Sequence, residues 1–416
     1  MKKWIKLFFR KKGADKPIFM AIFVLICLGI VMIGSASIGA VSSKGTSFAI
    51  RNMAMQTVYV LFGLFIMMAL TKSFRTKFIN YRFSMIMYFV GLASMCVCVL
   101  WTAKGSHAWI HVGPITIQPA EFMKVAMILI LSYMLTETDA AFVVKGRFRT
   151  AELKSQFYKD KFIKCVLFPL GLMLVAFFVG AGIQKDLGTS LILASICFIC
   201  FMSTPRDYYK KYKKLVWIAL GVAVVILGFL ITAVLQGYQM ERINSWLKPL
   251  ELENIYSSSW QLVNSLIAFA DGGIFGLGLG NSIQKYDYIP EAHNDFIGAI
   301  IYEELGIFGL ALIIIPTAII IFRLLKYADE IQDSKSKVIL IGISSYFMLH
   351  LLVNLGGVSG LIPMTGVPIL LVSSGGSSTV SALIAIGIAQ AIISKYNKEQ
   401  LEKQTPIKLL CIKYIR

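Results

Sequence analysis

The chain has 416 residues, of which 57% are hydrophobic and only 15% are charged, and its mean hydropathy is +0.73. Soluble domains carry about 25% charged residues, so an ordinary soluble enzyme or binding module is excluded. The formal net charge of +19 could suit a nucleic-acid-binding protein. Here, however, the Lys and Arg residues gather at the ends of apolar runs, where they face anionic lipid. We therefore expect no nucleic-acid partner.

Apolar runs of nearly twenty residues recur along the whole chain, and this is the length that an α-helix needs to cross about 30 Å of hydrocarbon. The alternating ten-residue strands of a membrane barrel are absent. We predict an all-α polytopic membrane protein with ten transmembrane helices. The predicted helices are at residues 17–37, 50–71, 83–103, 119–136, 162–181, 187–204, 215–235, 294–322, 338–358 and 367–394.

The orientation follows from the charges between these helices, because Lys and Arg concentrate in cytoplasmic loops. Placing the N-terminus inside puts most of the 41 Lys and Arg residues on the cytoplasmic side, and adding or removing one helix would destroy this alternation. Both termini are therefore predicted to be cytoplasmic. The chain divides into a basic segment 1–16, a membrane domain 17–396 and a basic tail 397–416, with a large extracellular loop 236–293 between helices 7 and 8.

Two patterns that resemble cofactor motifs are better explained by packing. Cys197 and Cys200 form a CxxC, but they lie in an apolar span without a second pair, and the seven cysteines suggest no disulfide framework. The glycines between Gly272 and Gly280 follow no strand and lie in an extracellular loop, so they do not indicate a dinucleotide site. A P-loop is also absent. Chemistry on the outer face must therefore use a substrate that is already activated.

The first polar cluster in chain order runs from Lys104 to Lys124 (KGSHAWIHVGPITIQPAEFMK). Pro119 suits the first turn of a helix. Glu121 and Lys124 are three residues apart, so they share a helix face and can pair, which makes their charge tolerable at membrane depth. Either a functional site or a structural ion pair between helices explains them.

The second cluster, GIQKDLGTS, places Asp186 at the start of the sixth predicted helix. A carboxylate suits the positive end of a helix. Capping of the helix is the simpler explanation for this aspartate, and a functional role is the alternative.

The third cluster, PEAHNDF, stands at the mouth of the eighth predicted helix. If that helix begins near Asn294, Asp295 lies in its first turn at the outer boundary. Three ionisable side chains, Glu291, His293 and Asp295, exceed what a helix cap needs, so a function is favoured over capping. Deeper in the same helix, one of the adjacent residues Glu303 and Glu304 must face the protein interior, because it is costly for both to point to lipid.

The fourth cluster, Gly356 to Ser378, contains irregular, glycine- and proline-rich sequence within an apolar stretch. Such backbone is permitted in a membrane only where protein buries it or where it lines a water-filled cavity. The run Ser-Ser-Gly-Gly-Ser-Ser opens the last helix, and exposed amides at a helix start can bind an anion such as a phosphate. A helix broken only for packing is the alternative.

Together these clusters resemble, in order, the four signatures of the SEDS family (shape, elongation, division and sporulation) of FtsW-, RodA- and SpoVE-like proteins, over residues 17–396. The resemblance implies a peptidoglycan glycosyltransferase that polymerises lipid II, a disaccharide-pentapeptide on undecaprenyl diphosphate, at the outer membrane surface. It also implies a class B penicillin-binding protein as the transpeptidase partner, among other divisome or elongation proteins. The aspartate that the family requires in this motif falls on Asp295.

We expect Asp295 to act as general base on the acceptor 4-hydroxyl, with His293 tuning or positioning it. The diphosphate needs positive charge or amide donors, which Lys124, Lys285, Arg242 or the Gly375 and Gly376 amides could supply, and a divalent cation (Mg²⁺ or Mn²⁺) is a further candidate. The residues expected to bind substrate are Trp109, Gln118, Glu121, Lys124, Asp186, Arg242, Lys285, Glu291, Ser374, Gly375, Gly376 and Ser377.

The chain departs from the family pattern at several positions. Ala108 stands where members usually carry a basic residue, with His107 as the nearest substitute, Asn294 replaces a threonine, and Ser374 replaces a tyrosine. The aspartate of the second motif follows a lysine rather than a proline. The pattern leans to the division or sporulation branch, and two other functions stay open: a lipid II flippase, or a scaffold that activates a partner synthase.

Overall fold

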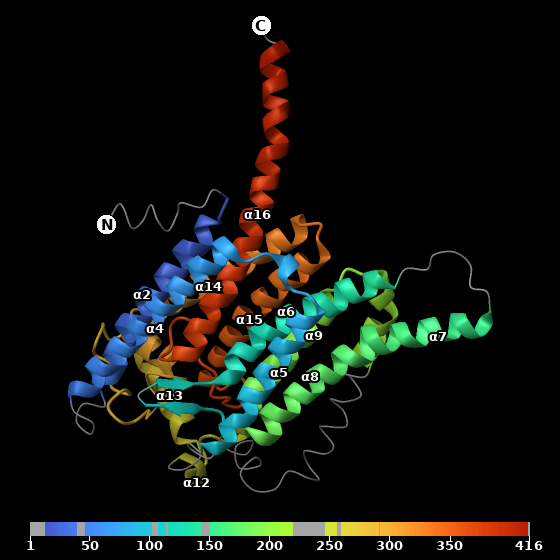
Figure 1. Cartoon of the computed structure of the whole chain (residues 1–416). Helices are drawn as coiled ribbons and strands as arrows, with labels where there is room; N and C mark the ends of the chain where they lie inside the picture. The colour runs from blue at the N-terminus through green and yellow to red at the C-terminus, as the bar shows by residue number, and fades with distance from the viewer. Residues whose placement is uncertain are drawn as a thin grey trace.

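The computed structural model describes residues 13–39, 46–101, 107–113, 115–142, 150–218, 246–255, 259–290 and 292–414. Long helices form a bundle, with a small β-hairpin at one end (Figure 1). The elements are α2 (Lys16–Ile38), α4 (Thr46–Ser73), η1 (Thr76–Phe78), α5 (Tyr81–Val97), η2 (Cys98–Leu100), β1 (Ile110–Val112), β2 (Ile115–Ile117), α6 (Pro119–Ala141), α7 (Ala151–Phe162), η3 (Ile163–Leu167), α8 (Phe168–Phe178), η4 (Val179–Ile183), α9 (Leu187–Ser203), η5 (Asp207–Tyr209), α12 (Leu252–Ile255), α13 (Trp260–Gly272), α14 (Ile297–Glu330), α15 (Ser334–Val358) and α16 (Gly376–Tyr414).

In the described part of the chain, eight helices are long and apolar enough to cross a membrane. A ninth candidate is α9 together with the helix that ends at Ile218, which meet at 116°. The chain is therefore a polytopic helical membrane protein. The predicted seventh helix, 215–235, lies mostly outside the described residues, so the full count of ten stays a prediction.

Three predicted features differ in detail from the structure. The loop before α6 forms an antiparallel hairpin in which Ile110 pairs with Ile117, whereas only helices were expected. The eighth predicted helix begins at Ile297 rather than at residue 294, and the last begins at Gly376 rather than at 367. In both places glycine, proline or hydrogen-bonding side chains hold the chain in turns until the helix can start.

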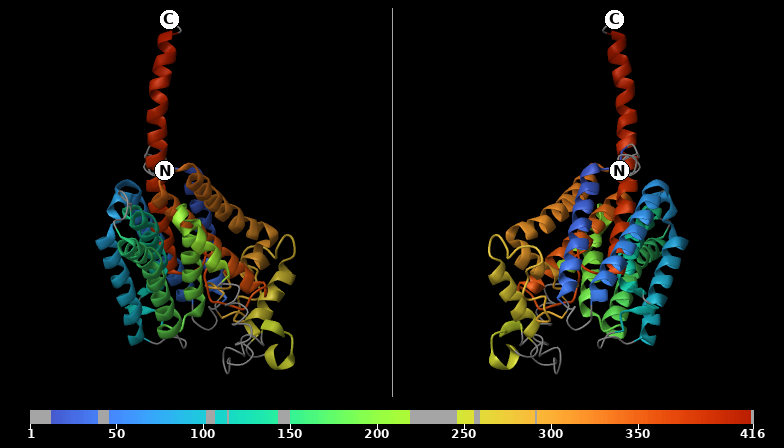
Figure 2. Two further views of the ribbon diagram at one scale, coloured as in Figure 1. Left: turned by 90° about the vertical axis from the view of Figure 1, so that its right-hand side faces the viewer. Right: turned by 90° about the vertical axis from the view of Figure 1, so that its left-hand side faces the viewer.

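The centre of the bundle is formed by α6 and the first half of α16, residues 376–394, whose side chains are buried almost all round, as expected for helices surrounded by protein. Around them, α16 packs along α4, and α14 packs against both α15 and α2 (Figures 1 and 2). Large apolar side chains on α4, α5 and α8 are exposed, among them Phe62, Phe89 and Phe178, as expected for lipid-facing surfaces. The six cysteines with described side chains are free, and four of them, Cys98, Cys165, Cys197 and Cys200, are buried.

The N-terminal end of α2 and the C-terminal half of α16 lie at the same end of the molecule (Figure 1). Asp15, the N-cap of α2, exchanges two 2.9 Å hydrogen bonds with the side chain of Gln390 on α16. Its carboxylate is also bound by Arg323 and by the Tyr327 hydroxyl, both on α14. The start of the described chain is thus fixed to α14 and α16.

Candidate active site

The four polar clusters lie together at the opposite end of the bundle, near the hairpin and α13. Three of them are the starts of helices, because α6 begins at Pro119, α9 at Leu187 and α16 at Gly376 (Figure 1). The fourth is the turn that leads into α14. Helix starts carry free N–H groups and partial positive charge, so this end of the bundle favours an anion.

Gln118 connects three of the clusters. Its backbone N–H donates to the Ser377 hydroxyl at 2.8 Å, and its side-chain amide donates to Oδ2 of Asp186 at 2.9 Å. The other carboxylate oxygen of Asp186 accepts the backbone N–H of Thr189 at 3.0 Å, which is the capping interaction expected from the sequence. The structure therefore brings Gln118, Asp186 and Ser377 together, and Asp186 caps α9 at the same time.

The predicted pair of Glu121 and Lys124 is present, with Oε1 and Nζ 2.7 Å apart and both side chains fully buried. Nε2 of His350 lies 2.9 Å from the same ammonium, and the Tyr346 hydroxyl donates to the other oxygen of Glu121 at 3.1 Å. The His350 Nδ1 lies 3.0 Å from the carbonyl of Pro368. Since that carbonyl can only accept, Nδ1 carries the proton and Nε2 accepts from Lys124. This burial favours the structural alternative for the pair.

Asp295 lies in a turn, Ala292 to Phe296, that precedes α14. The backbone carbonyl of His293 accepts the Ser374 N–H at 3.0 Å, and that of Asp295 accepts Nδ2 of Asn354 at 2.7 Å. The same amide donates to the carbonyl of Val367, also at 2.7 Å. The turn is thus fixed at two points to the irregular segment before α16, while the His293, Asn294 and Asp295 side chains stay half-buried.

The Asp295 carboxylate faces Gly366, where a Cβ atom would lie 3.4 Å from Oδ2. Gly366 has a φ of +70°, which favours glycine. On the other side of this turn, the Thr365 carbonyl packs against Gly188 in the first turn of α9, so closely that a Cβ there would come within 2.4 Å. One tight turn therefore separates Asp295 from the helix start that Asp186 caps.

The sequence suggested that the backbone N–H groups at the start of α16 are exposed, but two of them already have hydrogen-bond partners within the protein. The Ser374 N–H is bound to His293, and the Gly375 N–H donates to Oε1 of Gln56 at 3.3 Å. Gly376 packs against the ring of Tyr59, where a Cβ would come within 2.5 Å. An anion at this point would have to displace one of these partners.

The remaining predicted residues are dispersed. Trp109 is half-buried just before β1, and Lys285 is buried in an ion pair with Glu304 at 2.9 Å. Glu303 and Glu304 are both buried, so both rather than one of them face the interior. Arg242 and Glu291 lie outside the described residues. Among the residues that are described, no three His, Cys, Asp or Glu side chains are placed to hold a metal ion.

Sequence reasoning missed His350, Tyr346 and Asn354, three residues of α15 that contact the predicted site residues Lys124, Glu121 and Asp295. The available signal was polar side chains in an otherwise apolar run, YFMLHLLVN. Their partners lie on other helices, at separations such as 226 residues between Lys124 and His350.

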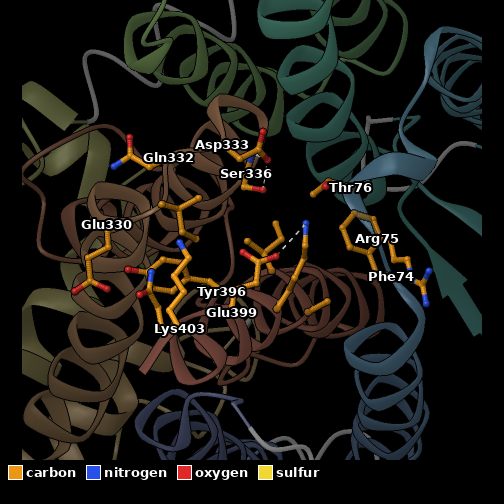
Figure 3. A pocket seen from close by; sticks show the side chains of 15 residues that line it. Phe74, Arg75, Thr76, Glu330, Gln332, Asp333, Ser336, Tyr396, Glu399 and Lys403 are labelled. Atoms are coloured by element: carbon orange, nitrogen blue, oxygen red, sulfur yellow. Dashed lines mark hydrogen bonds and ion pairs between the residues drawn. The ribbon is translucent and has the colours of Figure 1, made fainter. Parts of the chain in front are cut away.

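A cavity of about 270 Å³ lies at the other end of the molecule, between the α4–α5 connection, the α14–α15 connection and α16 (Figure 3). Its labelled side chains are of mixed charge, including Arg75, Glu330, Asp333, Glu399 and Lys403. Glu330 is the last residue of α14, whereas the Asp295 turn precedes its first residue, Ile297. This cavity is therefore not part of the candidate active site.

The fold and the site define a class: a helical membrane protein with one polar centre built from helix starts. A family model for FtsW, RodA and SpoVE, described as cell cycle protein, matches residues 16–399. Among curated relatives, the probable peptidoglycan glycosyltransferase FtsW of Bacillus subtilis (strain 168) is 34% identical over 402 residues, 94% of each chain. Stage V sporulation protein E of the same organism is 30% identical over 393 residues, covering 94% of this chain and 99% of the relative.

Solved structures agree on the fold. One, described as "Structural coordination of polymerization and crosslinking by a peptidoglycan synthase complex", has a TM-score of 0.69 at 19% identity and covers 92% of this chain and 98% of its own. Thermus thermophilus RodA has a TM-score of 0.57 at 19% identity, with 92% and 97% covered. The protein belongs to the FtsW, RodA and SpoVE family of cell cycle proteins and is a multi-pass protein of the cytoplasmic membrane.

Proposed function

We propose that this protein is a peptidoglycan glycosyltransferase that polymerises lipid II into glycan strands on the outer face of the cytoplasmic membrane. The names and coverage of its relatives support this activity. The position of Asp295 is the observation that supports placing this activity at the candidate active site. Its backbone is fixed by Asn354, and its half-buried carboxylate faces a tight turn where three motif-bearing segments meet.

Asp295 is the general base in this proposal. Its carboxylate takes the proton of the acceptor sugar's 4-hydroxyl while that oxygen attacks the anomeric carbon of the donor. The bond from that carbon to the lipid diphosphate breaks, and undecaprenyl diphosphate leaves with the electron pair. Because the diphosphate is already a good leaving group, one base is sufficient, unlike the two carboxylates of a glycosidase.

The diphosphate is proposed to lie near the starts of α6, α9 and α16, where Gln118, Asp186 and Ser377 meet. Helix starts stabilise phosphate through N–H groups and partial positive charge. Lys124 and Lys285 are each paired with a buried carboxylate, so we do not assign them to direct substrate contact. A divalent cation at this point would be held chiefly by the substrate's own diphosphate, since the described residues contain no ligand cluster for it.

The departures from the family pattern lie around the proposed diphosphate end. Ala108 is buried, and the ring Nδ1 of His107, its nearest substitute, lies 3.1 Å from the carbonyl of Trp101. His107 is thus held beside its own chain. We propose that charge is instead supplied from the neighbouring second motif, where a lysine precedes Asp186.

A class B penicillin-binding protein is the proposed partner, as the family resemblance implies and as the fold match to a peptidoglycan synthase complex supports. Ten membrane helices, both termini cytoplasmic and an extracellular loop at 236–293 complete the proposed topology. The similarity to FtsW and to stage V sporulation protein E supports a role in division or sporulation.

The test uses the purified protein with its partner and labelled lipid II, comparing the parent with Asp295→Ala. Glycan chains from the parent and none from the variant support polymerisation. Lipid II movement across vesicles without chain formation would favour the flippase. Normal partner binding without product from either protein would favour the scaffold.

A further inference from the structure

The extracellular segment that precedes Asp295 is folded onto a break in α14. The helix is interrupted at Gly306, which has φ 60° and ψ −146°. The carbonyls of Glu303 and Glu304 accept the N–H groups of Leu277 and Gly278, each at 2.9 Å. One residue past the break, the Ile307 N–H donates to the carbonyl of Ile274 at 3.0 Å. The loop therefore supplies the hydrogen bonds that the helix lacks, as irregular backbone near a membrane requires.

The contact between loop and helix is too close for any side chain at two positions. A Cβ atom on Gly276 would lie 2.3 Å from the Glu304 carbonyl oxygen, and one on Gly306 would lie 2.2 Å from that of Ile274. Both glycines also have positive φ angles. This register of loop and helix is therefore fixed by backbone geometry (Figure 2, where α13 is yellow and α14 orange).

Two buried carboxylates then anchor the next stretch of the loop. Glu303 accepts the Ser282 hydroxyl at 2.5 Å and the N–H groups of Ile283 at 2.7 Å and Gln284 at 3.2 Å. Glu304 accepts the Gly280 N–H at 2.9 Å. We call Glu303, Glu304 and Lys285, with Ser35 and Ser282, the anchoring cluster.

All three N–H donors of the Lys285 ammonium are hydrogen-bonded within the anchoring cluster or to the backbone of the loop. Its ammonium donates to Oε1 of Glu304 at 2.9 Å, to the Gly280 carbonyl at 2.6 Å and to the Ser35 hydroxyl on α2 at 3.1 Å. Three donors thus meet three acceptors, and the side chains of Lys285 and Glu304 are 1% and 0% exposed. Removing one charge of such a pair leaves the other buried and uncompensated.

The short segment between the anchoring cluster and the Asp295 turn is itself held by backbone hydrogen bonds. The Ile289 N–H donates to the Gln284 carbonyl at 3.0 Å, and the Ala292 N–H donates to the Ile289 carbonyl at 3.2 Å. The side chains of Ile289 and Ala292 are buried. From the other direction, Glu303 lies about two helical turns from the start of α14. The Asp295 turn is therefore held from both sides by the same cluster.

From this arrangement we infer that Lys285, through its ion pair with Glu304, is a positioning residue for the glycosyl transfer. The inference rests on the proposed function, and it replaces the direct substrate contact expected for Lys285 from the sequence. Lys285 does not touch the substrate. It holds the loop on α14 so that the Asp295 carboxylate keeps its place beside the Gly366 turn.

The test compares Lys285→Met with the parent and with the double variant Lys285→Met/Glu304→Gln. Chain polymerisation with labelled lipid II gives kcat and KM, and hydrogen exchange is followed in residues 282–296. We expect the single variant to lose about 100-fold in kcat with KM within about 2-fold, together with faster exchange in the Asp295 turn. The double variant, which leaves no unpaired charge, should recover at least about 10-fold of that loss and slow exchange.

The matched control is Lys248→Met in the same extracellular segment. It removes an exposed ion pair in which the Lys248 ammonium lies 2.7 Å from the Glu251 carboxylate. This variant should change neither kcat nor hydrogen exchange. If Lys285→Met raises KM and leaves kcat unchanged, Lys285 contacts the substrate directly, and the inference is overturned. Parental kcat despite faster exchange would overturn it as well, as would a kcat loss without faster exchange. If Lys285→Met does not fold, the double variant decides, because a kcat below about 10% of the parent in a folded double variant is incompatible with the expected rescue. A parent that makes no glycan would instead contradict the proposed function.

Discussion

Asn354 donates through a single amide nitrogen to the backbone carbonyls of Asp295 and Val367, each at 2.7 Å. Because both partners can only accept, Nδ2 is the atom that faces them. Asn354→Leu keeps the volume but leaves two buried carbonyls without a donor. We expect kcat for chain formation to fall about 10- to 100-fold, since small displacements of a catalytic group have effects of this size.

A matched control for this variant is Asn264→Ala on α13. Asn264 is also buried, but among the described residues its amide donates only to the Trp260 carbonyl within its own helix. Its loss should leave kcat unchanged. Parental activity of folded Asn354→Leu would show that the amide bridge does not position Asp295.

Replacing the carboxylate itself is the most direct test of the chemistry. Asp295→Asn preserves shape and half-burial but cannot take a proton, so we expect polymerisation to fall by about 10²- to 10⁴-fold, the usual contribution of a general base. Thermal unfolding and partner binding should match the parent. Glycan formation by this variant at the parental rate would remove Asp295 from the mechanism.

The buried pair of Glu121 and Lys124 is expected to matter for stability. Lys124→Met should lower the free energy of unfolding by about 3–5 kcal/mol, because it leaves the Glu121 charge uncompensated among α6, α15 and α16. Adding Glu121→Gln should restore most of the loss. Unfolding in detergent measures the free energy of unfolding of the single and the double variant. The control is the exposed ion pair of Lys395 and Glu399, where Lys395→Ala should lower the free energy of unfolding by less than about 1 kcal/mol.

The break in α14 makes a second stability prediction. Gly306→Ala introduces a Cβ atom 2.2 Å from the Ile274 carbonyl at a positive φ, so it should lower the free energy of unfolding by more than about 2 kcal/mol. Gly171→Ala on α8, where a Cβ atom would meet nothing within 4 Å, should instead stabilise the protein by about 0.5–1 kcal/mol. Equal effects in thermal unfolding would contradict the described register of loop and helix.

Lys185 is the exposed cation nearest in sequence to the proposed diphosphate site. It has a φ of 55° and directly precedes the N-cap Asp186, and no acidic side chain of the described chain forms an ion pair with it. We expect Lys185→Gln to raise the KM for lipid II about 3- to 10-fold at low salt with kcat little changed, and the difference should shrink as salt is added. A salt-independent effect, or none, would show that this charge does not meet the substrate.

Local patterns in the sequence predicted much of the fold. The long apolar runs located the described membrane helices, and short-range spacing predicted the Glu121–Lys124 pair and the cap by Asp186. What could not be predicted depends on contacts between distant segments. Lys285 meets Glu304 across a 19-residue separation only because the loop folds back onto a broken helix. Its burial in this ion pair is the reason why we infer an anchoring role for Lys285 in place of the phosphate contact expected from the sequence.

The same limit applies to the starts of the last helix and of α14. Propensity favours helix from residue 367, but the Gly366 turn, the Ser373 hydroxyl bound to the Ile369 N–H, and the Ser374–His293 contact hold the chain in turns until Gly376. These bonds join separate motifs, so no single stretch of sequence contains them. The hairpin before α6 is similar, because only three residues a side form it.

The interruption at Gly306 divides α14 into an outer part, residues 297–305, and an inner part, residues 307–330. The outer part carries the Asp295 turn and is joined to the loop, whereas the inner part is joined through Arg323 and Tyr327 to the start of α2. A continuous rod would transmit a tilt of its inner part directly to the Asp295 turn. Across the break the two parts are also joined through the backbone of the loop, so a movement of the inner part would reach the turn only together with the loop that braces it.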